Sequence, residues 1–194
     1  MLEHDVLVIG AGLAGMRAAI AARAEGASVA IISKVHPVRS HSNAAQGGIN
    51  AALTDRGDDW EDHAYDTVKG SDFLGDQDAI EVMCASAGQA LIDMEHFGVT
   101  FNRDDEGKLG TRAFGGQRRA RTFFVGDFTG QALLHVMFEQ LIKSGVRRYE
   151  EWFVTALIEE DGRVCGVTAL EIPTGQIYAI RAKTVIFCTG GLGR

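Results

Sequence analysis

Apolar and polar positions near the start of the chain predict a strand, a helix and a second strand. Asp5–Ile9 is a short apolar run that ends at a glycine, and an alanine-rich stretch from about Gly12 to Glu25 has a helical pattern. Gly26 is placed to stop that helix, and a second apolar run covers Ser28–Ile32. Such units connect by a right-handed crossover, so we expect two neighbouring parallel strands.

The middle of the chain is less regular. Residues 35–59 lose periodicity and gain Ser, Asn, Gly and His, a composition typical of loops that carry binding residues. Helices are predicted from about Asp76 to His96, with Asp76 as the cap and Gly98 as terminator, and over Thr129–Ser144, closed by Gly145. Between these two helices, residues 99–128 are rich in Gly and Arg and show no clear period.

The last third of the chain changes to strands. From Trp152 onward, turn signals at residues 160–162 and 173–175 predict a small antiparallel meander. The final apolar run, Thr184–Cys188, is continuous, as in a strand buried on both faces. The pattern predicts an α/β, Rossmann-like fold with a parallel central sheet and a β-meander.

Length and composition restrict the class of protein. With 194 residues, 46% of them hydrophobic, the chain suits one soluble domain or a domain with an appendage. A net charge of −7 argues against attraction to nucleic-acid phosphates. Its apolar runs are far shorter than a membrane span and it starts without a signal-peptide pattern, so a cytoplasmic protein is expected. The isolated cysteines at 84, 165 and 188 predict reduced core residues and no metal site.

A glycine-rich turn follows the first predicted strand and opens the first predicted helix. In this context Gly10 makes the tight turn, Gly12 lets the backbone approach a pyrophosphate, and Gly15 lets helix and sheet pack closely. A bound dinucleotide is the favoured interpretation, and a tight turn without a ligand is the alternative. The expected cofactor contacts are Gly10, Ala11, Gly12, Leu13, Ala14 and Gly15.

The end of the second strand departs from the usual dinucleotide pattern. An Asp or Glu there normally binds the ribose 2′-hydroxyl, but this strand ends at Ser33, followed by Lys34. A serine can still hydrogen-bond a ribose, whereas the lysine removes the simplest argument for NAD. FAD is therefore at least an equal candidate.

The loop that follows carries a family resemblance. Its sequence Arg39-Ser-His-Ser42, followed by Ala45-Gln-Gly-Gly48, resembles the flavin loop of succinate dehydrogenase and fumarate reductase flavoprotein subunits. In that family the histidine bonds through a ring nitrogen to the 8α-methyl carbon of FAD, and His41 is the matching residue. A neutral imidazole nitrogen can add to the quinone-methide form of the flavin. The resemblance implies covalent FAD, whereas the histidines at 36, 63, 96 and 135 have no such support.

The resemblance extends over most of the chain. Residues 63–79, 112–117, 127–135 and 188–194 are similar to further family segments, the last being a second glycine-rich flavin contact. Beyond the first turn, the flavin contacts that it implies are Ser33, Lys34, Ser40, His41, Ser42, Ala45, Gln46, Gly47, Gly48, Val154, Thr189 and Gly190.

Two matched positions concern the substrate. By resemblance, Gln46 and Phe114 lie beside the flavin and a dicarboxylate. Succinate dehydrogenases carry Gln where many fumarate reductases carry Glu, which favours succinate oxidation, although Gln46 can equally be a loop amide that satisfies backbone groups. The nearby arginines can attract a dicarboxylate or form a solvated or interface-facing basic cluster; they are Arg118, Arg119 and Arg121.

The resemblance implies a flavoprotein subunit of succinate dehydrogenase. Such a subunit oxidises succinate to fumarate by hydride transfer to FAD and passes electrons to an iron–sulfur subunit and a quinone. It lies on the inner face of the cell membrane through anchor subunits. Alternatives are a fumarate reductase flavoprotein, an L-aspartate oxidase, whose loop lacks the linking histidine, and a non-catalytic flavin-binding module.

The family's substrate-clamping residues come from a capping domain and a later segment of the chain. We therefore expect residues 1–194 to be the N-terminal FAD-binding domain of a longer subunit, without catalytic residues or a capping domain and inactive alone. Its expected parts are a βαβ unit and flavin loop in 1–60, a helical and loop insertion in 61–150, and the meander and return strand in 151–194.

Overall fold

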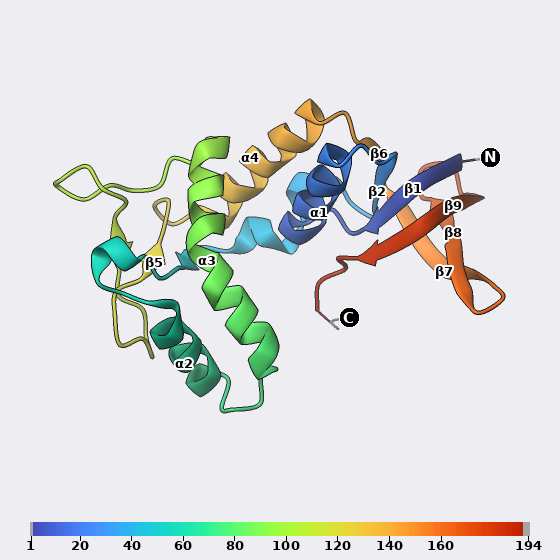
Figure 1. Ribbon diagram of the computed structural model, residues 1–194. Helices are drawn as coiled ribbons and strands as arrows, with labels where there is room; N and C mark the ends of the chain where they lie inside the picture. The colour runs from blue at the N-terminus through green and yellow to red at the C-terminus, as the bar shows by residue number, and fades with distance from the viewer. Residues whose placement is uncertain (1, 192–194) are drawn as a thin grey trace. The chain divides into compact units, whose positions relative to one another are not determined.

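The computed structural model describes residues 2–191 (Figure 1). Contacts divide the chain into two compact units: the first contains residues up to 43 together with those from 134 onward, and the second contains residues 44–133. Helix α4 (Thr129–Lys143), predicted from its pattern, begins in the second unit and continues into the first. None of the helices within residues 2–191 is both long and apolar enough to cross a membrane.

The first unit is built on a six-stranded sheet, which confirms the predicted fold class. Four neighbouring strands are parallel and the last two pair antiparallel, so the parallel sheet and the meander form one continuous structure. In spatial order the strands are β6 (Arg147–Glu150), β2 (Val29–Ser33), β1 (Leu2–Ile9), β9 (Gln176–Phe187), β8 (Arg163–Glu171) and β7 (Trp152–Glu160).

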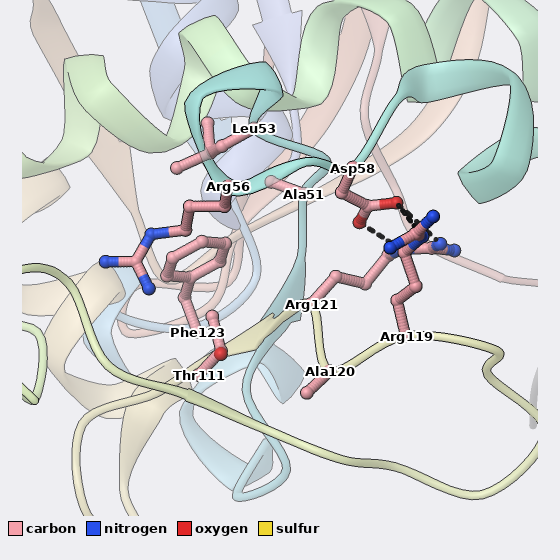
Figure 2. A pocket seen from close by; sticks show the side chains of 9 residues that line it. All are labelled: Ala51, Leu53, Arg56, Asp58, Thr111, Arg119, Ala120, Arg121 and Phe123. Atoms are coloured by element: carbon pink, nitrogen blue, oxygen red, sulfur yellow. Dashed lines mark hydrogen bonds and ion pairs between the residues drawn. The ribbon is translucent and has the colours of Figure 1, made fainter.

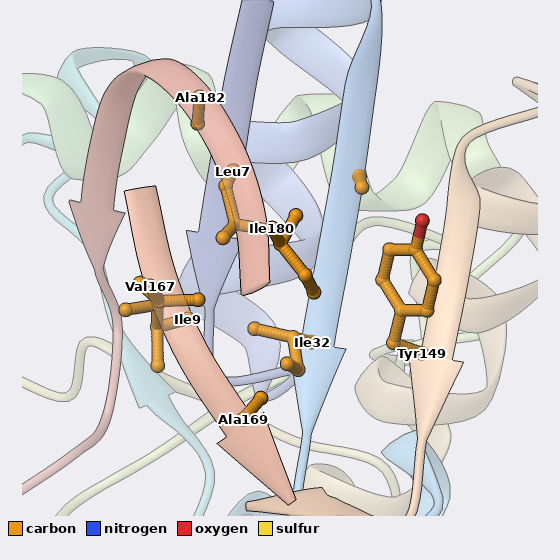
Figure 3. Close-up of a cluster of buried hydrophobic side chains, with 9 residues drawn as sticks. Leu7, Ile9, Ile32, Tyr149, Val167, Ala169, Ile180 and Ala182 are labelled. Atoms are coloured by element: carbon orange, nitrogen blue, oxygen red, sulfur yellow. The ribbon is translucent and has the colours of Figure 1, made fainter. Parts of the chain in front are cut away.

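This sheet curls around a buried core (Figure 3). Strands β6 and β7 lie at opposite ends of the strand order, yet only Glu151 separates them along the chain. Glu151 has a positive φ of 62°, unusual for a non-glycine residue, where the chain turns from one strand into the other. The enclosed side chains come from five strands: Leu7, Ile9, Ala30, Ile32, Tyr149, Val167, Ala169, Ile180 and Ala182.

Strand β9 corrects one prediction. The run Thr184–Cys188 was expected to be buried on both faces, but Val185 and Ile186 are half-buried and Phe187 is 58% exposed. Helix α1 (Leu13–Ala24) packs against β1 and β2 and buries their second face instead. An apolar run predicts a strand, whereas its burial depends on which strands the helices cover.

The second unit contains a helix pair and a small sheet. Helix α3 (Gln77–Phe97) has the predicted caps: the Asp76 carboxylate accepts from Ala79 N at 3.1 Å, and Gly98 takes a positive φ of 117°. Helix α2 (Trp60–Gly70) was not predicted; Asp59 caps it by accepting from Asp62 N at 2.8 Å.

Several short elements also escaped prediction because each is only a few residues long. A three-stranded antiparallel sheet pairs residues up to 74 positions apart, Ile49 with Phe123, and short 3-10 helices lie in the loops. The strands are β3 (Ile49–Asn50), β5 (Thr122–Phe123) and β4 (Thr111–Arg112); the 3-10 helices are η1 (Pro37–Arg39), η2 (His41–Ala44) and η3 (Thr54–Arg56).

Candidate functional site

The turn from β1 into α1 has the close approach expected of Gly10. Its φ is +102°, and its N–H donates to Ile32 O at 2.8 Å. A Cβ at this position would lie 2.2 Å from the carbonyl oxygen of Cys188, the residue that follows β9. No side chain fits in that space. Glycine therefore allows the ends of β1, β2 and β9 to lie close together.

Gly15 and Gly12 differ in how much space a side chain would have at each position. A Cβ on Gly15 would lie 1.8 Å from Gly10 O, so the helix packs directly on the turn. A Cβ on Gly12 would meet nothing closer than Ser40 Oγ at 3.5 Å. Gly12 is also the N-cap of α1 and offers no side-chain hydrogen bond, which leaves the first N–H groups of the helix for an anion.

Two serine hydroxyls converge on Gly12. Besides Ser40 Oγ, Ser42 Oγ lies 3.7 Å from the position of a Gly12 Cβ. Ser40 Oγ is buried and makes no hydrogen bond within the described part of the chain, a state that costs stability unless a ligand satisfies it. The helix N-terminus and this hydroxyl together fit the pyrophosphate of a dinucleotide such as FAD.

His41 lies between these serines in sequence and begins η2. Its side chain is exposed, unlike the buried Ser40 hydroxyl. An exposed imidazole between two serines that approach Gly12 is accessible for a bond to a flavin.

Most of the other predicted cofactor contacts in the first unit lie at or just after the ends of strands. Ser33 ends β2, Lys34 is exposed after it, and Thr189 and Gly190 follow β9. Val154 differs, because its side chain packs against the core of the curled sheet, so only its backbone is available to a cofactor. The final part of the expected second glycine-rich contact, 192–194, lies outside the described residues.

In the second unit, Arg112 holds the strip Ala45–Gly48 in place. Its guanidinium donates to Gln46 O at 3.0 Å and to Gly47 O at 3.1 Å, and lies 4.4 Å from the ring centroid of Phe124. Gly48 has a φ of +113° and approaches Phe123 O too closely for any Cβ. The backbone of the predicted flavin strip is thus fixed by an arginine that sequence reasoning did not select.

The structure also brings Phe114 to this strip. A Cβ on Gly47 would lie 3.1 Å from the Phe114 ring, and that ring is 51% exposed. Gln46 is exposed as well. The two predicted substrate-side residues are therefore close to Gly47, in loops that adjoin the small sheet, and both side chains are exposed.

The arginines at 118, 119 and 121 were expected either to attract a dicarboxylate or to form a solvated or interface-facing cluster, and the structure shows a third arrangement. Arg121 is buried, and its guanidinium contacts Asp58 Oδ2 and Asp66 Oδ2, each at 2.8 Å. Arg118 also pairs with Asp66, while Arg119 lies 3.7 Å from Asp58. These contacts tie the loop to α2 and the residues before it, so the cluster is an internal ion-pair network.

A cleft of about 250 Å³ lies beside this network (Figure 2). Its lining combines Ala51, Leu53 and Phe123 with three arginines. Each arginine has an acidic neighbour, including Asp104, which lies 3.6 Å from Arg56. Within the described residues, each arginine that lines the cleft therefore has its charge compensated by a nearby carboxylate, which weakens any attraction to an anionic substrate.

Substitutions in the glycine turn are expected to separate folding from cofactor binding. Gly15→Ala forces a backbone clash and should lower the free energy of unfolding by about 1–3 kcal/mol. Gly12→Ala meets no such clash but places a methyl group where the pyrophosphate approaches, so FAD affinity should fall about tenfold or more with little loss of stability. Urea unfolding and FAD titration measure the two effects; equal losses in both variants would contradict this assignment.

Comparisons with known proteins agree with this geometry. Residues 5–194 match the FAD binding domain family. The fumarate reductase flavoprotein subunit of Mycobacterium tuberculosis is 49% identical over 195 residues, covering 99% of this chain and 33% of that protein. The succinate dehydrogenase flavoprotein subunit of Rickettsia bellii is 48% identical, covering 99% of this chain and 34% of that protein. The chain thus spans about a third of the length of these relatives.

Solved structures of similar proteins share the fold. E. coli quinol fumarate reductase matches with a TM-score of 0.92 and 38% identity, covering 100% of this chain and 34% of that one. The Mycobacterium smegmatis Sdh1 complex matches with a TM-score of 0.94 and 33% identity, covering 99% of this chain and 35% of that one. With its glycine turn, its serine hydroxyls and a match that covers nearly every residue, this chain belongs to the FAD binding domain family.

Proposed function

We propose that this chain is the FAD-binding part of a succinate dehydrogenase-type flavoprotein and that His41 links the flavin covalently. The observation that carries the proposal is the meeting of the buried Ser40 hydroxyl and the Ser42 hydroxyl at Gly12, with the exposed His41 between them in sequence. Relatives at 48–49% identity that are succinate dehydrogenase or fumarate reductase flavoprotein subunits support it.

FAD, when bound, supplies the acceptor for a hydride from the dicarboxylate. The residues of this chain bind and orient it. The first N–H groups of α1 and the Ser40 hydroxyl would hold the pyrophosphate, and His41 would supply the ring nitrogen that is bonded to the flavin. Arg112 fixes the carbonyls of Gln46 and Gly47, which sets the direction of that strip.

The proposed reaction is the oxidation of succinate to fumarate, with Gln46 and Phe114 on the substrate side. The other direction, fumarate reduction, is the second candidate, because the relative from M. tuberculosis is a fumarate reductase flavoprotein subunit. Residues that clamp the dicarboxylate and move its proton would belong to a capping domain and a later segment of a longer protein. Partners would be an iron–sulfur subunit and membrane-anchor subunits, which would place it on the inner face of the cell membrane.

The full-length protein tests this proposal. After acid precipitation the flavin should remain with the protein, and succinate should reduce an artificial electron-accepting dye. Release of the flavin by acid would favour an aspartate oxidase or a non-catalytic module instead. Residues 1–194 alone should not turn over succinate, and dye reduction by this piece would contradict the assignment of the substrate-clamping residues to other segments.

A further inference from the structure

Strand β2 ends without the acidic residue that usually binds the adenosine ribose of a dinucleotide. That residue accepts hydrogen bonds from ribose hydroxyls at the carboxyl end of the second strand. Here the position is Ser33, followed by the exposed Lys34. A ribose bound at this edge therefore lacks a carboxylate from β2 itself.

The neighbouring strand supplies one. Strand β6 pairs in parallel with β2, and the register places Glu150 beside Ser33. Ser33 and Glu150 are the last residues of their strands. They therefore lie at the carboxyl end of the parallel strands, where the Gly10 turn follows β1. Neighbouring strands are about 4.8 Å apart, a distance that a glutamate side chain spans.

The side chain of Glu150 is on the appropriate face. The preceding register pair, Ile32 and Tyr149, points into the core of the curled sheet. Because successive side chains alternate between faces, Ser33 and Glu150 both point to the opposite face. The Glu150 side chain is 30% exposed, so a ligand at the strand ends can reach it.

Its carboxylate is oriented but keeps acceptor capacity. Oε1 accepts from Arg148 Nε at 2.9 Å, whereas Oε2 lies 3.7 Å from His36 Nε2, longer than a hydrogen bond. The ring of His36 is in turn held edge-on against Phe138, with 5.0 Å between ring centroids. Arg148 thus fixes one oxygen and leaves the other for a hydroxyl donor.

We propose that Glu150 binds the ribose hydroxyls of the adenosine half of FAD, in place of an acidic residue at the end of β2. This inference rests on the proposed function for one point, the identity of the cofactor as FAD. It assigns a cofactor-binding role to β6, a strand without a sequence motif. The pyrophosphate at α1 and the ribose at β6 would then follow the carboxyl ends of three adjacent parallel strands.

The test is a binding cycle on the full-length protein in a His41→Ser background, which keeps the cofactor exchangeable. Affinities for FAD and for FAD lacking the adenosine 2′-hydroxyl are measured by fluorescence titration, with and without Glu150→Gln. Loss of a charged acceptor should weaken FAD binding about tenfold or more and change the affinity for the deoxy analogue much less. Glu160→Gln, at the end of β7, is the matched control and should leave both affinities unchanged, because Glu160 lies 3.8 Å from Arg181 at the opposite end of β7 from Glu150.

Equal weakening for FAD and the analogue would overturn the proposal, because the carboxylate would then act only on the fold around Arg148. No effect on either ligand would overturn it as well. Failure of the unsubstituted protein to bind FAD is a separate result that contradicts the proposed function itself.

Discussion

Replacing His41 with serine is expected to release all of the flavin when the protein is precipitated with acid, while the unsubstituted full-length protein retains it. Serine has no ring nitrogen that can bond to the 8α carbon, and the exposed position of His41 means that its loss disturbs no core packing. FAD should still bind, because we expect the pyrophosphate to be held by α1 and Ser40, whose N–H and hydroxyl groups do not depend on residue 41. Absorbance of the pellet and the supernatant at flavin wavelengths measures the result.

A second measurement separates linkage from binding. If the covalent bond raises the flavin potential, the His41→Ser protein should show a lower potential and slower succinate oxidation with near-normal FAD content. His135→Ser is the matched control, since this histidine is also exposed but lies on α4, and its flavin should stay covalent. Retention of flavin by the His41→Ser protein would show that another residue makes the link.

Local patterns predicted the parts of the fold that local physics determines. The turn at Gly10, the caps of α3 and the meander follow from glycine conformation, carboxylate capping and strand alternation. Helix α2 was not predicted even though Asp59 caps it, because its eleven residues are too few to show a clear helical repeat of apolar positions. The burial of β9 was misjudged because that property depends on where a helix packs.

Contacts between distant residues could not be read from sequence. Arg112 reaches the carbonyls of Gln46 and Gly47 across 65 or more positions, and the Ser33–Glu150 pair depends on the register of two strands. For Arg121, the sequence shows only one more arginine in a basic run. Its burial against two carboxylates follows from the docking of a loop onto α2, a long-range event without a short-range signal.

The largest stability effect is expected at Arg121. Arg121→Met keeps much of the side-chain volume but leaves Asp58 and Asp66 buried without their shared cation. Removing one partner from a buried ion pair costs about 3–5 kcal/mol. Here Asp58 loses its hydrogen-bonded cation and both carboxylates stay desolvated, although Arg118 still pairs with Asp66 at 2.8 Å. Urea unfolding at neutral pH measures this loss. Arg119→Met is the control, since this half-exposed residue has contacts of 3.6 Å or longer and should cost about 1 kcal/mol or less.

The pH dependence of unfolding shows whether charge causes the Arg121 effect. Burial tends to raise the pKa of Asp66, but hydrogen bonds from Arg118 and the charge of Arg121 outweigh it and hold that pKa below its usual value. A lowered folded pKa means that this stabilisation is full above about pH 4, the unfolded value, and is lost as pH falls through the folded pKa. In the Arg121→Met protein the ionised Asp66 contributes less stability, so acidification removes less. The difference in the free energy of unfolding between Arg121→Met and the unsubstituted protein should therefore narrow below about pH 4. A gap that stays constant on acidification would instead assign the loss to packing of the guanidinium.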